Sequence, residues 1–193
     1  MKSILSSIRP KWVAKIFNGE KTIEVRKKFP KDYVGWVYMY CSKSNTQYLV
    51  GSKIQKCEII TKSSNARFSP NIDKYTGNGK VVARFWCDKV EEINRYCTGR
   101  GISYKTETLN NIELCDKSCL DLIEIDHYLY FKKGFAIHIS KLEIFDKPKE
   151  LSEFKSCKKN IVNTKINGMV FETELDNSLI KAPQSWCYCE VGE

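Results

Sequence analysis

The pattern of apolar and polar positions changes its period near the start of the chain. Apolar residues recur at helical spacing over residues 10–18, which predicts a short amphipathic helix. Gly19 predicts its end, because glycine adopts the left-handed conformation of a helix C-terminus without steric cost. The period then becomes two, which predicts a strand over residues 22–27 with Ile23 and Val25 on one face.

Further strands and one more helix follow from the same reasoning. The sequence Ser118-Cys119-Leu120-Asp121 resembles a capping box and predicts a helix that begins at Ser118 and ends at Gly134. Alternation and buried-type apolar runs predict strands over residues 2–8, 36–41, 80–87, 135–140 continuing over 142–145, and 182–189. Five to seven strands with an early and a later helix predict an α+β fold built on a small mixed barrel.

Two polar stretches interrupt this core pattern and read as insertions in a single domain over residues 1–193. The first, 43–79, contains a predicted hairpin that turns at Gly51-Ser52 and then a loop rich in turn-forming residues. The second, 155–181, contains a predicted hairpin around Asn167-Gly168.

The composition indicates which class of partner the protein binds. The 193 residues are 42% hydrophobic, which is enough for a real core, and they carry a formal net charge of +9. A basic excess of this size favours polyanionic partners, with RNA or DNA ahead of a membrane surface. A lysine-rich solvated surface is the alternative, because the charge is spread along the chain.

The cysteines indicate a reducing compartment, so the sequence predicts a cytoplasmic protein. There are nine cysteines, an odd number, with no Cys-x-x-Cys pair and no signal-peptide pattern before them. With only two histidines, we expect no metal site and no cofactor. No apolar run approaches the roughly 20 residues that span a bilayer, so no membrane partner is expected.

The strand over residues 22–27 allows two interpretations. Its second face carries Thr22, Glu24 and Arg26, and Lys21 stands at its start. This set of a hydroxyl, an acid and two bases is typical of a solvated sheet surface. It is also what the floor of a polar binding cleft would carry.

The residues around this strand resemble an ASCH domain of a phage-type or bacterial member, a family in the PUA-like superfamily of small β-barrels. The resemblance rests on Ser7-Ile8-Arg9-Pro10-Lys11-Trp12 and on Gly19-x-Lys21-x-x-Glu24-x-Arg26. Later segments that fit the family are Lys80–Phe85, Ala136–Ser140 and Pro183–Tyr188. It does not cover the two insertions.

The resemblance implies a cleft that binds RNA or a nucleotide-like ligand, with DNA as a further candidate. Lys21 and Arg26 would neutralise phosphate or bind a base edge, and Glu24 would accept from an exocyclic amine or orient Arg26. Aromatic residues would stack on an unstacked base, and polar residues would form the rim. The stacking candidates are Trp12, Tyr40 and Trp186, and the rim candidates are Arg9, Lys43 and Gln184. A structural alternative is packing by both tryptophans and a Glu24–Arg26 salt bridge across the sheet.

Catalysis is the second hypothesis, and the sequence favours binding over it. Small ASCH relatives look like amidohydrolases of acetylated cytidine, and Lys21 matches their lysine. Glu24, however, occupies the position of their threonine, so the hydroxyl is missing. A metal-dependent ribonuclease would need a carboxylate cluster, and the acidic residues between 116 and 126 read as solvated charge. His138 either lines the cleft or is a hydrogen-bonded sheet residue. A protein-interaction module is the third hypothesis.

Overall fold

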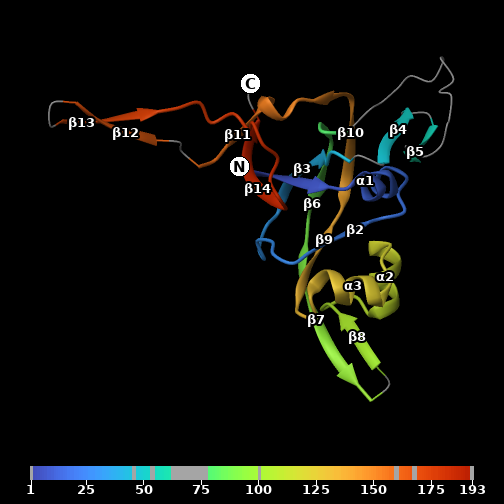
Figure 1. The fold of residues 1–193 in the computed structure, drawn as a ribbon. Coiled ribbons are helices and arrows are strands. Elements are labelled where there is room, and N and C mark those ends of the chain that lie inside the picture. Colours follow the sequence, from blue (N-terminus) through green and yellow to red (C-terminus); the bar gives the residue numbers. More distant parts are fainter. Residues whose placement is uncertain are drawn as a thin grey trace.

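The structure is a computed structural model that describes residues 2–44, 47–52, 55–61, 78–99, 101–158, 161–166 and 169–191. The chain has a mixed α+β fold in which strands predominate (Figure 1). The helices are α1 (Pro10–Phe17), α2 (Asn111–Ser118) and α3 (Leu122–Leu129), with a 3₁₀ turn at Leu151–Glu153. The strands are β1 (Ser3–Ile8), β2 (Ile23–Arg26), β3 (Gly35–Cys41), β4 (Gln47–Ser52), β5 (Gln55–Thr61), β6 (Val81–Cys87), β7 (Val90–Thr98), β8 (Gly101–Lys105), β9 (Gly134–His138), β10 (Ser140–Lys149), β11 (Phe154–Ser156), β12 (Ile161–Ile166), β13 (Met169–Glu174) and β14 (Trp186–Val191).

The larger sheet has six strands in the order β10-β6-β3-β1-β14-β11. Strand β1 lies inside it, parallel to β3 and antiparallel to β14, so that Ser3 is paired with Cys189. The predicted strands at the start of the chain and at its C-terminal end therefore lie side by side. Figure 1 shows β1 and β14 next to each other in the upper half of the molecule.

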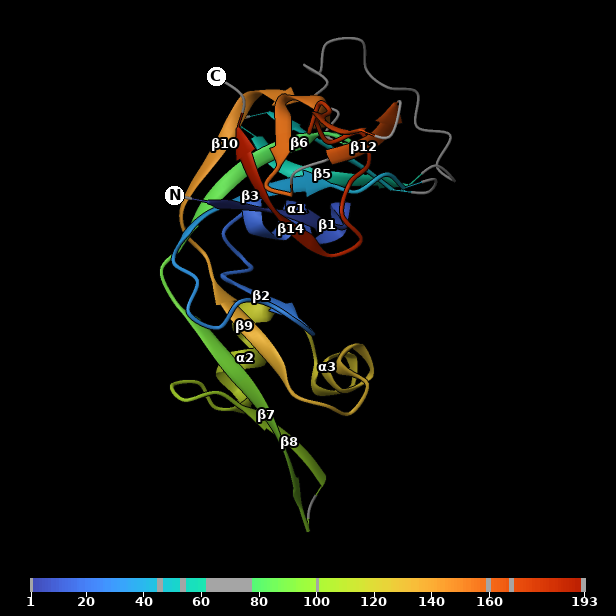
Figure 2. The same cartoon turned by 90° about the vertical axis from the view of Figure 1, so that its left-hand side faces the viewer.

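The smaller sheet has four strands in the order β2-β9-β7-β8 and continues directly from the larger one. Strand β7 begins shortly after β6, and β10 begins shortly after β9, so two neighbouring chain segments cross from one sheet into the other. The register of β10 on β6 shifts near Lys141, whose φ of 41° marks an irregular backbone. The result is a curled half-barrel, visible as the long bend through β6, β7, β9 and β10 in Figure 2.

Helix α1 forms where the sequence predicts it. Pro10 is its first residue, Asn18 is its C-cap, and Gly19 follows with a φ of 74°. The N–H of Gly19 donates to the carbonyl of Ile16 at 3.0 Å, which closes the last turn. The buried face of α1 includes Val13, so the predicted amphipathic pattern is confirmed.

The prediction of one helix between Ser118 and Gly134 is wrong. Ser118 is the last residue of α2, and the chain then turns at Cys119, which has a φ of 55°. Asp121 is the N-cap of α3, and its carboxylate accepts from the N–H of Glu124 at 2.7 Å. Gly134 begins β9 instead of ending a helix, and a Cβ there would lie 2.5 Å from a methyl carbon of Leu129 and 3.0 Å from the carbonyl oxygen of Arg26.

Three apolar clusters hold these elements together. The first packs α1 against the six-stranded sheet and includes Ile4, Val13 and Phe85, and the second packs α2 and α3 against the four-stranded sheet. The third covers the opposite side of the six-stranded sheet around Phe154. The eight cysteines whose side chains the structure describes are free thiols, and in the described part of the chain no helix is both long and apolar enough to cross a membrane.

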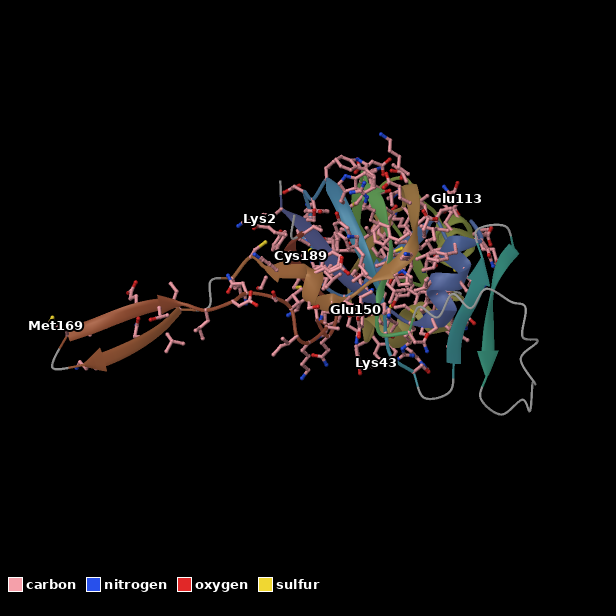
Figure 3. The ribbon with its side chains drawn as sticks, turned by 90° about the horizontal axis from the view of Figure 1, so that it is seen from above. Lys2, Lys43, Glu113, Glu150, Met169 and Cys189 are labelled. Carbon is pink, nitrogen blue, oxygen red and sulfur yellow. The ribbon has the colours of Figure 1, made fainter. Side chains whose placement is uncertain are left out.

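Two hairpins lie outside these sheets, and the first of them packs against α1. Strands β4 and β5 pair with each other, as predicted for the first polar stretch, whereas residues 53–54 and 62–77 lie outside the described chain. Strands β12 and β13 form the second predicted hairpin, and Figure 3 shows Met169 at its far end, well away from the body. The predicted boundary at residue 155 falls within β11, which pairs with β14 in the main sheet.

Candidate functional site

The polar side chains of β2 lie in the interior and not on a solvated sheet surface. Glu24 is opposite Ile137 of β9 in the register, and Ile137 belongs to the first apolar cluster. Directly paired residues share a face of the sheet, so Glu24 and Arg26 point toward that cluster. Only 7% of Glu24 and 6% of Arg26 is exposed, and Lys21 is 2% exposed. This burial excludes the interpretation of the strand face as a solvated sheet surface.

Lys21 is held by three different elements. Its ammonium donates to the carbonyl of Ser118 at 2.7 Å, at the C-terminus of α2, where the helix dipole favours a cation. Its Nζ lies 3.3 Å from Oε2 of Glu24 and 5.2 Å from the ring centroid of Trp12 on α1. Burial lowers the pKa of Lys21, and the neighbouring carboxylate of Glu24 acts in the opposite direction.

Arg26 connects the two sheets. Its Nη2 lies 3.0 Å from Oε1 of Glu24 and donates to Oγ of Ser6 at 2.9 Å and to the carbonyl of Ser7 at 2.7 Å, both on β1. Its Nη1 donates to Oγ of Ser185 at 3.5 Å, and its buried Nε has no hydrogen-bond partner among the described residues. Ser6 lies on the same buried strand face as Ile4 and Ile8. A polar residue at such a position indicates a buried polar partner, and the sequence analysis did not use this signal.

Aromatic side chains border this buried group, which we call the Lys-Glu-Arg site (Lys21, Glu24 and Arg26). Trp12 is half-buried, and the ammonium of Lys11 lies 4.4 Å from its ring centroid. Tyr128 of α3 is 38% exposed, and its phenol lies close enough to Arg26 for that charge to act on its pKa. Burial raises the pKa of Tyr128, while the charge of Arg26 acts against that rise. Two cations and one carboxylate leave the site with a formal charge of +1.

The other predicted binding residues lie in different surroundings. Arg9 is exposed at the N-cap of α1, and its charge influences Tyr128. Gln184 is exposed beside Ser185, close to Arg26, whereas the exposed Lys43 lies against Gly79. Tyr40 is 7% exposed within the third apolar cluster, so we leave it out of the proposed binding surface.

Trp186 anchors the C-terminal strand near the site. Its indole N–H donates to the carbonyl of Lys28 at 2.7 Å, and its ring centroid lies 5.5 Å from that of Phe29. These contacts match the packing alternative considered for this residue. The segment before it supplies Ser185 to Arg26 and the carbonyl of Pro183 to the hydroxyl of Ser7 at 2.6 Å.

A second buried polar group lies on the opposite face of the four-stranded sheet, and the sequence did not reveal it. Glu91 of β7 is 3% exposed and accepts hydrogen bonds from Thr106 and Thr108. His138 lies 2.7 Å from the same carboxylate through its Nε2, so it is a hydrogen-bonded sheet histidine. The sheet separates this group from Glu24, because Glu91 is opposite Ala136 and Glu24 is opposite Ile137.

The acidic residues between 116 and 126 do not all carry solvated charge, which corrects that prediction. Asp126 is 4% exposed, accepts from Nε of Arg95 at 2.8 Å and also from the hydroxyl of Tyr104. Asp121 and Glu124 form the capping box of α3. Among the residues with described positions, no group of three His, Cys, Asp or Glu side chains could hold a metal ion.

Comparison with known proteins places this geometry in context. The family model described as the ASCH domain matches residues 7–107. A crystal structure of ASCH from Zymomonas mobilis is similar at 11% identity and a TM-score of 0.47, over 97% of this chain and 87% of that one. A tyrosine-to-phenylalanine mutant of the same Zymomonas mobilis protein is similar at 10% identity and a TM-score of 0.41, over 97% and 90% of the two chains. A search of curated proteins gave no match.

Proposed function

The chain belongs to the ASCH domain family, and from this membership and the geometry of the Lys-Glu-Arg site we propose that it binds RNA or a nucleotide-like ligand there. Lys21 and Arg26 act as fixed cations beneath the ligand, and Glu24 holds both in place. The exposed cations at the start of α1, Arg9 and Lys11, contact phosphate from the solvent side.

One observation carries the proposal: each buried cation of the site has an aromatic ring beside it. Trp12 lies next to Lys21, and Tyr128 lies next to Arg26. Fixed positive charge with neighbouring aromatic faces is the combination that binds phosphates and unstacked bases together. The unpartnered Nε of Arg26 gives the site a further donor, and the net charge of +9 favours the approach of a polyanion.

Binding of a fluorescent 12-nucleotide RNA, measured by anisotropy at several salt concentrations, tests this proposal. We expect Arg9→Gln and Lys11→Gln each to weaken binding about 3- to 10-fold. Each should also lower the slope of log affinity against log salt by about one, because each variant loses one phosphate contact. Both side chains are exposed, so the variants should fold as the unchanged protein does.

Lys147→Gln provides the control, because it removes the same charge from an exposed position on β10, at the edge of the six-stranded sheet. It should leave RNA affinity unchanged. The proposal fails if the unchanged protein does not bind RNA at 50 mM salt, or if Lys147→Gln weakens binding as much as the two variants of α1.

A hydrolase is the second candidate function, and the environment of Lys21 favours it. A lysine whose pKa is lowered by burial, 3.3 Å from a carboxylate, has the features of an acid-base pair. Incubation with acetylcytidine or single-stranded RNA, with and without magnesium, should then give turnover that Lys21→Met abolishes. Methionine keeps the length of the side chain without its amine. Equal turnover, or none, in the two proteins excludes this candidate.

A further inference from the structure

The end of helix α3 has an unusual backbone. Its C-cap residue Tyr130 has a φ of 53°, and the next residue, Phe131, has a φ of 60°. Left-handed conformations are uncommon for bulky residues, and helices usually place glycine or asparagine there. Two consecutive aromatic residues in this conformation are therefore strained, and strain at such a place points to a role outside folding.

The rings of Tyr130 and Phe131 at this turn are not packed in the apolar core. Tyr130 is 66% exposed and Phe131 is 58% exposed, whereas their neighbour Leu129 is 2% exposed and packs in the second apolar cluster. With Tyr128, which is 38% exposed, these rings form a surface that we call the aromatic corner (Tyr128, Tyr130 and Phe131). Large aromatic side chains gathered in solvent are typical of a binding surface.

Cations lie over these rings. The ammonium of Lys27 is 3.8 Å from the ring centroid of Tyr130 and 5.2 Å from that of Tyr128. The guanidinium carbon of Arg95 is 5.7 Å from the ring centroid of Phe131. A cation held against an aromatic ring offers one ligand both a stacking surface and a phosphate contact. This charge favours nucleic acid over an apolar protein segment as the occupant.

The aromatic corner is also continuous with the Lys-Glu-Arg site. The charge of Arg26 acts on the phenol of Tyr128, and Lys27 directly follows Arg26 at the end of β2. A strand that passes Tyr128 therefore reaches Tyr130 next, since Lys27 lies against both rings. Because the rings of Tyr128 and Tyr130 both lie within 5.2 Å of Nζ of Lys27, they are close enough to meet neighbouring bases of one strand.

We propose that the aromatic corner stacks unpaired bases of a single-stranded RNA, with Lys27 neutralising the adjoining phosphate. This inference rests on the proposed function and deepens it, because it defines the ligand as single-stranded and adds residues that no motif of the chain indicates. Duplex RNA does not fit, because its bases are already stacked on each other and cannot cover the rings.

Tyr130→Gly and Phe131→Gly test the inference without endangering the fold. Glycine removes the ring and also relieves the left-handed backbone, so each variant should unfold at the same urea concentration as the unchanged protein or a higher one. Each should bind a single-stranded 12-nucleotide RNA about 5- to 50-fold more weakly. Lys27→Gln should weaken binding less and lower its salt dependence, because it loses a phosphate contact but keeps both rings.

Ile123→Ala is the matched control, since Ile123 is a large apolar residue on the same helix, 68% exposed, that carries no aromatic ring. It should bind RNA as the unchanged protein does, and a duplex of the same sequence should bind at least 10-fold more weakly than the single strand. If the glycine variants keep full affinity while Arg9→Gln and Lys11→Gln lose it, the aromatic corner is excluded and the proposed function stands. Equal affinity for duplex and single strand also overturns the inference, and absence of all RNA binding overturns both proposals.

Discussion

Replacing Glu24 by glutamine is expected to lower the free energy of unfolding by about 3 to 5 kcal/mol. The carboxylate lies 3.3 Å from Nζ of Lys21 and 3.0 Å from Nη2 of Arg26, and all three side chains are almost fully buried. A neutral amide would leave two buried cations close together without an opposite charge. Urea unfolding at pH 7, followed by tryptophan fluorescence, measures this loss.

Glu143→Gln is the control for this prediction, because it breaks a salt bridge of similar length in an exposed position. Glu143 accepts from Nε of Arg84 at 2.7 Å, and 46% of its side chain is exposed. Solvent screens such a pair, so the change should be about 1 kcal/mol or less. If both variants lose the same small amount, the buried charges of the Lys-Glu-Arg site are not coupled as the geometry requires.

Glu91→Gln is expected to cost about 2 to 3 kcal/mol at pH 7, because hydrogen bonds to a buried carboxylate are stronger than those to an amide. Burial by itself would raise the pKa of Glu91, but hydrogen bonds from Thr108, Thr106 and His138 outweigh it and lower the pKa to about 2 from 4.5. The folded state thus holds the proton less tightly than the unfolded state. The stabilisation is complete above pH 4.5 and is lost as the pH falls toward 2.

The pH dependence of stability checks the second prediction. The unchanged protein should lose stability between pH 4.5 and 2, and Glu91→Gln should show a flatter curve over the same window. Glu92→Gln is the matched control, because Glu92 is the next residue of β7, points to the other face and pairs with the exposed Lys133 at 3.2 Å. A Glu91→Gln curve that is parallel to those of Glu92→Gln and the unchanged protein would contradict the assignment.

The sequence predicts the first half of the fold well, because its signals there are local. The change of period at Gly19 places α1 and β2, and the apolar run at 36–41 corresponds to β3. Strand β7 is different, because the buried Glu91 occupies a position where an alternating pattern needs an apolar residue. The carboxylate is stable there because hydroxyl groups from another segment donate hydrogen bonds to it. An argument based on hydrophobic period therefore does not recognise this segment as a strand.

The region of α2 and α3 shows how two similar local signals compete. Ser118 and Asp121 have the spacing of a capping box, yet Ser118 is needed as the last residue of α2. The boxes that form are Asn110 with Glu113 and Asp121 with Glu124, each with the same spacing. The sequence cannot rank these boxes, since the choice depends on Leu114 and Leu129 packing in the second apolar cluster.

The sequence likewise predicts one part of the candidate site and not the other. Lys21, Glu24 and Arg26 are close in sequence, and their motif predicts that they act together. Their remaining partners come from distant elements: the carbonyl of Ser118 lies 97 residues from Lys21, and Ser185 lies 159 residues from Arg26. Contacts of this range depend on the topology of the sheets, which local patterns do not encode.

The position of β1 has a consequence for the order in which the molecule assembles. Strand β1 can pair with β3 as soon as residue 41 is available, but its other edge must wait for β14, which begins at Trp186. Contacts between such remote segments form slowly, and during synthesis the strand has an unpaired edge until residues 186–191 have left the ribosome. Ser185, which completes the surroundings of Arg26, arrives with β14. Ligand binding at the Lys-Glu-Arg site would therefore serve as a late marker of folding, absent from nascent chains that already contain every residue of the motif.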